Sequence, residues 1–210
     1  MKKEVRPVEN FSKIQFKDFG TLTLSQGDQE SLTIEADEQL LKELTSEVRN
    51  GTLELGIGRD WWDRIGKLIS SVFSGEEHKV FYHLTVKNLE ELNISGNCKL
   101  KCDSLVSEDL SIKVSGLGDL AFQHLEANTL DLRISGRGEF SAAGRADKQE
   151  VRISGSGEYL AGDLSSQSLR IVISGQGNAT VRVEESLDIT ISGLGQVNYY
   201  GQPKLRQVIS

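Results

Sequence analysis

The motif Ser-Gly-x-Gly recurs through the second half of this sequence at an almost constant interval, and this repeat constrains the fold more than any other feature. The Ser-Gly pairs begin at Ser95, Ser115, Ser135, Ser154, Ser174 and Ser192, so successive copies are 20, 20, 19, 20 and 18 residues apart. A fixed period of this length indicates a structural unit that stacks on copies of itself. We therefore interpret each copy as one coil of a repeat protein.

Apolar and polar residues alternate on both sides of each motif, which is typical of strands with one buried face. The apolar pairs before each serine are Ile112 and Val114, Leu132 and Ile134, Val151 and Ile153, Ile171 and Ile173, and Ile189 and Ile191. The inward candidates after the second glycine are Leu120 and Phe122, Phe140 and Ala142, Tyr159 and Ala161, Ala179 and Val181, and Val197 and Tyr199. We expect large residues to lie over small ones in neighbouring coils, because the core between them is narrow.

A unit of about 20 residues with a strand on each side of a glycine corner predicts an all-β fold, a parallel β-helix (β-solenoid) with about six regular coils. Glycine adopts positive φ without steric cost, and we expect the glycines to turn the chain for this reason. The predicted structural corners are Gly96, Gly116, Gly118, Gly136, Gly138, Gly155, Gly157, Gly175, Gly177, Gly193 and Gly195. Phosphate binding explains six copies poorly, since a dinucleotide site needs a third glycine and a strand followed by a helix.

The sequence divides into three segments by pattern: 1–58, 59–79 and 80–210. Residues 80–210 hold the repeats, and residues 1–58 contain strand-like pieces that do not repeat cleanly. The N-terminal segment is either a set of degenerate coils or a small β cap. The offset of 21 residues between Leu32 and Leu53 fits the first alternative.

Residues 59–79, RDWWDRIGKLISSVFSGEEHK, break the strand pattern and predict an inserted amphipathic helix with Asp60 as its N-cap. The apolar residues at helical spacing are Trp61, Trp62, Ile65, Leu68, Ile69, Val72 and Phe73. This stripe either packs on the β-helix or forms an interface with a partner or a membrane surface, to which adjacent tryptophans are suited. The balanced charge of the segment argues against anionic lipid.

The outward positions carry two charge patterns. An acidic column follows the corners: Asp119, Glu139 and Glu158, preceded by Lys99 and continued by Asn178 and Gln196. These carboxylates could hold a cation such as calcium between coils, or they form a solvated face, since like charges repel weakly in water. Opposite charges also stand two residues apart before two of the serines, as Asp131 with Arg133 and Glu150 with Arg152, and such charged faces discourage aggregation of sheets.

Composition excludes several functions. The net charge of −7 over 210 residues, without a basic stripe, excludes nucleic acid. No zinc-protease motif is present, and Ser156, which stands between glycines, shares its place in the repeat with Leu117 and Arg137 and is therefore a corner residue. We expect no cofactor and no enzyme activity, since the acidic residues repeat without the defined carboxylate pair of a glycoside hydrolase.

The two cysteines and the termini give further expectations. Cys98 and Cys102 would lie roughly 13 Å apart on one face of a strand, so we expect buried thiols rather than a mutual disulfide, with a CxxxC metal site as the alternative. The sequence has no apolar run of about 18 residues that could span a membrane. Lys2 and Lys3 are not followed by the apolar part of a secretory leader, so we expect a soluble chain.

Four stretches together resemble the bacterial auto-transporter adhesin family with a head GIN domain, which is common in Bacteroidetes. They are RPVENFSKIQFKDFGTLTLSQGDQESLTIEADEQLLKELTSEVRNGTLEL, LTVKNLEELNISG, the Ser-Gly-x-Gly series, and GLGQVNYYGQPKLRQVIS. The resemblance implies a right-handed β-helix, an extracytoplasmic location (periplasm or cell surface) and a role in adhesion or scaffolding. It supplies no catalytic residues. This chain departs from the family pattern in its longer insertion at 59–79 and in Cys98, which replaces the second glycine of the first corner and suggests that this corner bends differently.

These observations favour a non-enzymatic binding or adhesion module of the cell envelope that recognises a protein or a glycan through rigid faces. A β-helix protein that acts on or binds polysaccharide is the alternative, and a self-assembling structural protein is a third. The final coil ends near Ser210 and would leave a strand edge, so we also predict a homo-oligomer through that end or through the inserted helix.

Overall fold

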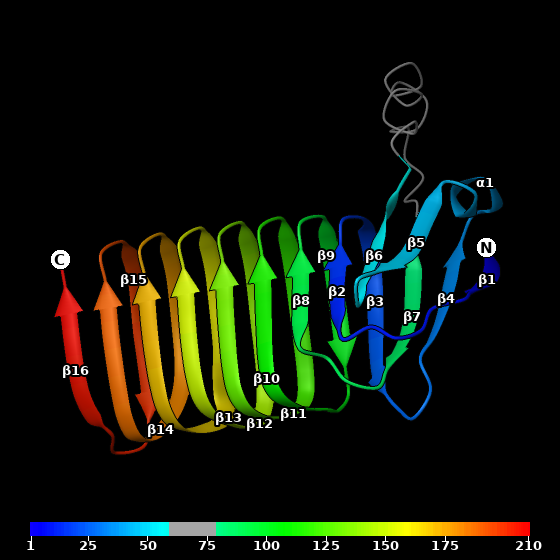
Figure 1. The fold of residues 1–210 in the computed structure, drawn as a ribbon. Helices are drawn as coiled ribbons and strands as arrows, with labels where there is room; N and C mark the ends of the chain where they lie inside the picture. The colour runs from blue at the N-terminus through cyan, green and yellow to red at the C-terminus, as the bar shows by residue number, and fades with distance from the viewer. Residues whose placement is uncertain (59–78) are drawn as a thin grey trace.

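The structure is a computed structural model that describes residues 1–58 and 79–210. The chain winds into an elongated β-solenoid whose strands belong to one continuous 16-stranded sheet (Figure 1). The regular coils contain β8 (Glu91–Ile94), β9 (Asn97–Cys102), β10 (Leu105–Val114), β11 (Leu117–Ile134), β12 (Arg137–Ile153), β13 (Ser156–Ile173), β14 (Gln176–Ile191), β15 (Leu194–Tyr200) and β16 (Lys204–Ile209). The prediction of an all-β parallel solenoid is confirmed.

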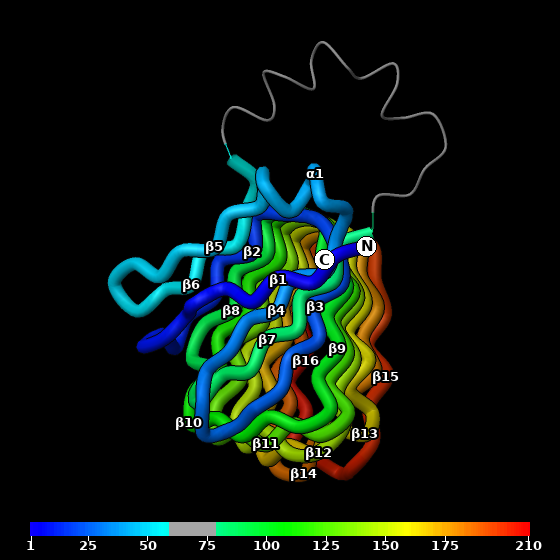
Figure 2. The backbone as a smooth tube through the Cα atoms, turned by 90° about the vertical axis from the view of Figure 1, so that its right-hand side faces the viewer, coloured from blue at the N-terminus to red at the C-terminus, as the bar shows by residue number. Residues whose placement is uncertain are grey.

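Each coil stacks in parallel register on the next, and this stacking buries the predicted alternating residues. Val114 pairs with Ile134, and Ile134 pairs with Ile153, so one column of the core consists of β-branched and aliphatic side chains. These side chains are buried, and the view along the solenoid shows the coils superimposed around a narrow interior (Figure 2). The two-residue alternation therefore places one face of every coil in a single continuous core.

One pair of aromatic residues in the core departs from the expected order of large over small. Phe140 pairs in register with Tyr159, and their ring centroids lie 5.4 Å apart in a stacked arrangement. Phe122 lies 5.5 Å from Phe140. Flat rings can stack at the spacing of coils, so Phe140 and Tyr159 are neighbours in one column where alternation of size was predicted. Elsewhere the predicted order holds, since Phe122 lies over Ala142 and Tyr159 is followed by Ala179.

Tyr159 also takes part in a buried polar contact that spans the core. Its hydroxyl donates a hydrogen bond to Oε1 of Gln149, at 2.7 Å. Gln149 stacks between Leu130 and Leu169 in a column that is otherwise leucine. Each polar side chain satisfies the other, which removes the cost that either would have when buried alone.

The corners contain the predicted glycines, but the predicted reason for them is wrong. None of the glycines at the Ser-Gly corners has φ in the positive region, which among glycines is found at Gly20, Gly51, Gly144 and Gly201. A Cβ on Gly155 would instead lie 2.0 Å from the carbonyl oxygen of Gly136 in the preceding coil. The first glycine of each corner is therefore required because stacked backbones approach too closely for any side chain.

The second glycine of each motif faces the core. A Cβ on Gly118 would lie 2.9 Å from Cγ1 of Val114. Cys98, which replaces this glycine in the first corner, is accommodated with its side chain buried. The first corner keeps the backbone hydrogen bonds of the others, since Ser95 and Gly96 both donate to Phe16 as Ser115 and Gly116 donate to Ile94. The first corner and the others are therefore alike in their hydrogen bonding.

Both cysteines are free and buried, as expected. Burial raises the pKa of the Cys98 thiol to about 12, with a smaller contribution from the nearby carboxylate of Asp119. Burial likewise raises the pKa of the Cys102 thiol to about 11. Because the thiolate is the reactive and metal-binding form, both side chains behave as small apolar residues.

The N-terminal segment forms both a coil and a cap. Its elements are β1 (Lys2–Arg6), β2 (Lys13–Phe16), β3 (Phe19–Gln26), β4 (Ser31–Ala36), α1 (Glu38–Leu41), β5 (Leu44–Arg49), β6 (Thr52–Ile57) and β7 (Phe81–Val86). The coil made of β2 and β3 lies between two others, because β2 pairs with β6 and β8 while β3 pairs with β7 and β9. The order of the coils in space therefore differs from their order in sequence.

Antiparallel strands cover this end of the solenoid. β4 pairs with β1 and β7, β5 pairs with β6, and the buried Leu40 and Leu41 of α1 join the core. The offset between Leu32 and Leu53 does not reflect a coil, because Leu32 pairs with Arg6 and Leu84 whereas Leu53 stacks on Ile14. Within the described residues, α1 is the single helix.

The predicted amphipathic helix, residues 59–79, lies outside the described part of the chain except for Lys79. In sequence these residues connect β6 to β7, the strands that stack on β2 and β3. They therefore take the place in the chain that a Ser-Gly corner takes in a regular coil. Among the helices that can be described, none has the length and apolar character needed to cross a membrane.

Candidate binding face

The predicted acidic column is a continuous feature of one face of the solenoid. Parallel register aligns the members of this polar ladder in the order Lys99, Asp119, Glu139, Glu158, Asn178 and Gln196. The ladder runs along the axis of the solenoid, with one side chain from each coil. Neighbouring members are separated by the distance between paired strands, about 4.8 Å.

Charge is balanced at one end of the polar ladder and not in its middle. Nζ of Lys99 lies 3.0 Å from Oδ2 of Asp119. Among the described residues, neither Glu139 nor Glu158 has a salt bridge, and at the far end Gln196 donates a hydrogen bond to Oδ1 of Asn198, at 3.0 Å. Two exposed carboxylates are therefore free to accept hydrogen bonds from a ligand.

The strands before the corners present a different surface, in which charges are paired. Nζ of Lys113 lies 2.7 Å from Glu91, and Arg133 lies 2.8 Å from Asp131. Arg152 pairs with Glu150 in the same way. These pairs confirm the predicted alternation of opposite charges, and the pKa of the Glu91 carboxyl is lowered by its hydrogen bond from Lys113. A ligand would have to compete with these contacts.

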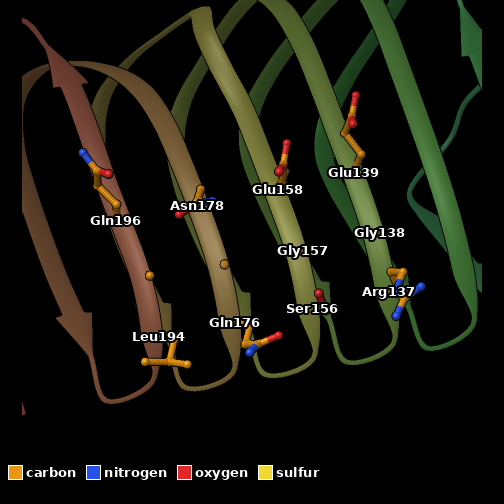
Figure 3. A pocket seen from close by; sticks show the side chains of 12 residues that line it. Arg137, Gly138, Glu139, Ser156, Gly157, Glu158, Gln176, Asn178, Leu194 and Gln196 are labelled. Atoms are coloured by element: carbon orange, nitrogen blue, oxygen red, sulfur yellow. The ribbon is translucent and has the colours of Figure 1, made fainter.

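A groove accompanies the polar ladder over β12 to β15 (Figure 3). We call it the corner groove, and its volume is about 710 Å³. One rim consists of Arg137, Ser156, Gln176 and Leu194, the other of Glu139, Glu158, Asn178 and Gln196, and the glycines Gly138, Gly157, Gly177 and Gly195 lie between them. The glycines face the core, so no side chain stands between the two rims and the groove is open along its length.

The corner groove offers many hydrogen-bonding groups. Its rims supply amide, hydroxyl and carboxylate groups, and one guanidinium from Arg137. An extended glycan or peptide lying along the groove would meet a similar set of groups at each coil. The groove has no aromatic residue in its lining, so a ligand there would be held by hydrogen bonds rather than by ring stacking.

The three carboxylates of the polar ladder lie in a single row. Among the residues that the structure describes, no group of three or more histidine, cysteine or acidic side chains is arranged to hold a metal ion. Asp119, Glu139 and Glu158 lie in one row with a single carboxylate from each coil, whereas calcium needs six to eight oxygen ligands around it. The prediction of a cation between these carboxylates is therefore not supported by the geometry.

A second groove, of about 620 Å³, runs along the opposite edge of the coils. Its lining includes the stacked residues Lys148, Ser168, Ser186 and Lys204. The neighbouring acidic residues Asp131 and Glu150 are occupied by Arg133 and Arg152. The corner groove combines carboxylate, amide and hydroxyl groups on two rims, and we take it as the candidate site.

The rims of the corner groove show what the sequence predicted and what it did not. The column of Asp119, Glu139 and Glu158 was predicted from its period. The variable residues between the glycines, such as Arg137 and Gln176, were interpreted as corner residues, but they form the other rim. The signal for them was their position two residues before the ladder, which places them on the same face of the strand. The predicted interface residues Trp61, Trp62, Ile65, Leu68, Ile69, Val72 and Phe73 lie outside the described residues.

The stacked parallel coils, the glycine corners and the polar outer faces define a β-solenoid with a surface suited to binding. Comparison with families agrees with the resemblance inferred above: residues 10–203 match the model described as "Putative auto-transporter adhesin, head GIN domain". The chain belongs to this family.

Several solved structures of similar proteins share the fold. A "putative adhesin" from Bacteroides fragilis superimposes with a TM-score of 0.86 at 22% identity, over 99% of this chain and 91% of the other. A "putative lipid binding protein" from Parabacteroides distasonis gives a TM-score of 0.71 at 22% identity, over 99% and 92%. A "putative adhesin" from Parabacteroides merdae gives 0.63 at 18% identity, over 99% and 92%. Among curated proteins, none is similar enough to count as a match.

Proposed function

We propose that this protein is a non-enzymatic binding module of the bacterial cell envelope that recognises its ligand along the corner groove. The observation that carries the proposal is the repetition of unpaired hydrogen-bonding side chains along a rigid face, including Glu139, Glu158 and Gln176. A repeated array on parallel coils gives many weak contacts with one extended molecule. Such contacts add up to useful affinity when the surface is already ordered before binding.

The proposed location is the cell surface or the periplasm, as the adhesin family implies. The proposed ligand is an extended glycan, since the groove offers amides, hydroxyls and carboxylates that can bond to sugar hydroxyls. Hydrolysis of that glycan is a poorer explanation, because the acidic residues repeat from coil to coil rather than forming one defined carboxylate pair.

A glycan array probed with the purified chain tests this proposal. The groove variant carries Gln176→Ala and Asn178→Ala, which remove two amides from opposite rims of one strand. We expect it to bind at least about tenfold more weakly than the natural chain, since each lost hydrogen bond costs about 1 kcal/mol. Thr190→Ala, on the other face of the same coil, is the matched control and should bind normally.

Two outcomes would contradict the proposal. Failure to bind any glycan would remove the proposed ligand class, and equal binding by the groove variant and the control would place the contact elsewhere. A separate variant with Trp61→Ala and Trp62→Ala tests the alternative that the segment between β6 and β7 makes the contact. Thermal unfolding of every variant distinguishes loss of binding from loss of the fold.

A further inference from the structure

The two ends of the solenoid differ in how their strand edges are treated. At one end the edge strand β1 has the sequence KKEVR, with charged residues at four of its five positions, and charge is a common protection of an edge. At the other end, among the described strands, β15 and β16 each pair with β14 alone. We call this second end the open end; β16 marks it in Figure 1.

The open end exposes side chains that belong to the core. Ile209 stacks on Ile191, yet it is 66% exposed whereas Ile191 is 7% exposed. Leu205 stacks on Leu187 and is 41% exposed, compared with 1% for Leu187. Tyr199, which continues the column of Val181, is 44% exposed. The last coil therefore presents a cross-section of the core to solvent.

The backbone at the open end is also available for pairing. The Ser210 amide donates to Ile191 of the preceding coil, at 3.0 Å. Because successive residues of a strand point their N–H and C=O groups in opposite directions, those of Leu205, Gln207 and Ile209 point away from β14. These are the residues whose side chains face the core. Apolar groups and free backbone groups thus coincide along one edge.

We propose that a second copy of this chain covers the open end, related by a two-fold axis, with β16 antiparallel to β16 of the second copy. In an antiparallel ladder, residues with free backbone groups must face each other and their side chains must lie on the same side. A two-fold axis through Gln207 meets both conditions. Gln207 then faces Gln207 of the second copy, and Leu205 faces Ile209.

The charges of β16 fit this register. Arg206 faces Val208 and Lys204 faces Ser210, so no like charges lie directly opposite each other. If the two-fold axis passed through Arg206 instead of Gln207, Arg206 would lie opposite Arg206 of the second copy. This register is unfavourable because like charges directly opposite each other repel. The same end of the solenoid carries β15, whose sequence LGQVNYY has no charged residue. No alignment of β15 with its copy can therefore bring like charges together.

This contact goes beyond the proposed function, because it requires no ligand. It would join two solenoids end to end and bury the exposed parts of Leu205, Tyr199 and Ile209. The corner groove reaches β15, so two corner grooves would meet at the contact. A ligand long enough to span both would gain affinity from simultaneous binding.

Sedimentation equilibrium of the 210-residue chain over a range of concentrations tests the contact. We expect a monomer–dimer equilibrium for the natural chain. Gln207→Glu places two carboxylates opposite each other at the two-fold axis and should weaken the dimer at least about tenfold. Gln167→Glu makes the same chemical change at an exposed position of β13, which lies between β12 and β14, and should leave the equilibrium unchanged.

Disulfide cross-linking tests the register. In Gln207→Cys the two cysteines would form a directly opposed pair with Cα atoms about 5.5 Å apart, which is within disulfide range. In Arg206→Cys the two cysteines would be diagonal neighbours, beyond the limit of about 7 Å. We expect oxidised dimers from the first variant only. The buried Cys98 and Cys102 are not available to form them.

Each outcome decides the proposal. Dimers weakened by Gln207→Glu and cross-linked through residue 207 alone would establish it. A strict monomer at high micromolar concentration would overturn it. A dimer that is insensitive to Gln207→Glu, or that cross-links equally through residue 206, would show that the copies meet through another surface or register and would overturn it as well.

Discussion

Two buried polar residues of this solenoid, Gln149 and Tyr159, stand in core columns and are hydrogen-bonded to each other. Gln149 replaces a leucine and Tyr159 follows a phenylalanine, and the two are joined by a hydrogen bond of 2.7 Å across the core. The neighbouring coils have apolar residues at these positions, which shows that the fold does not need either polar group. The pair is therefore a local substitution, and it is tolerated because the hydroxyl and the amide oxygen are hydrogen-bonded to each other.

A double-mutant cycle tests this interpretation. Gln149→Leu leaves a buried hydroxyl without an acceptor and Tyr159→Phe leaves a buried amide without a donor, so each should lower the free energy of unfolding by about 1–3 kcal/mol. The variant with both changes should be close to the natural chain, since both columns become apolar. Urea unfolding measures all four proteins. Strictly additive losses would mean that the two side chains do not depend on each other.

Asp18 is another buried polar residue, at a turn where the first coil meets its neighbours. Burial raises the pKa of its carboxyl above the ordinary value of 3.8, and hydrogen bonds from the hydroxyl of Tyr82 and the amide of Phe19 oppose this shift. The folded state therefore holds the proton of Asp18 more tightly than the unfolded state does. Its contribution to stability is complete below about pH 3.8 and is lost as the pH rises through the folded pKa.

The comparison with Asp18→Asn isolates this effect, since asparagine does not titrate. We expect the free energy of unfolding of the natural chain, relative to Asp18→Asn, to decrease as the pH rises from 3.8 and then to become constant above the folded pKa. Urea unfolding at a series of pH values measures the difference. A difference that stays constant, or that increases with pH, would mean that burial does not govern the pKa of the Asp18 carboxyl.

At the scale of the coil, the corner glycines reveal how the elements stack. Gly155 has no positive φ, but a Cβ there would lie 2.0 Å from the Gly136 carbonyl oxygen. Gly51 is the reverse case, with φ of +74° and no atom within 4 Å of the added Cβ. The same substitution at these two positions separates the need for space from the need for a special backbone conformation.

Gly155→Ala should destabilise the protein by at least about 3 kcal/mol, because coils cannot stack with a carbon atom between them. Gly155→Val should be at least as severe. Gly51→Ala should cost only about 1 kcal/mol, the strain of a left-handed residue. Chemical unfolding provides the measurement. If Gly155→Ala were tolerated and Gly51→Ala were not, backbone conformation rather than close approach would explain the corners.

The sequence predicted those elements whose contacts repeat at a fixed period. Ile134 meets Ile153 because they are 19 residues apart in successive coils, and the columns follow from this spacing. The pairing order of the N-terminal strands could not be predicted in this way. β2 pairs with β8 across more than 70 residues, and no repeat links Ile14 with Leu92. The second rim of the corner groove was missed because its residues differ in type from coil to coil. No one residue type recurs there with the period of the repeat.

The whole molecule combines a covered end with an open one, and this asymmetry determines where it should be least stable. In a stack of coils each coil is stabilised mainly by its neighbours, so a coil with one neighbour opens more readily than a coil with two. β16 has β14 as its described neighbour, whereas β12 lies between β11 and β13. At the other end, the buried residues of α1 and β5 join the core and complete the contacts there.

Hydrogen exchange followed by mass spectrometry tests this gradient, at a concentration low enough to keep the chain monomeric. We expect the amides of β15 and β16 to exchange fastest among the repeats and protection to rise through β14 and β13 to β12. At high concentration the amides of Leu205, Gln207 and Ile209 should become protected, because the dimer would occupy them. Gln207→Glu should show the gradient without this added protection. Equal protection of β16 and β12 in the monomer would contradict the dependence of each coil on its neighbours.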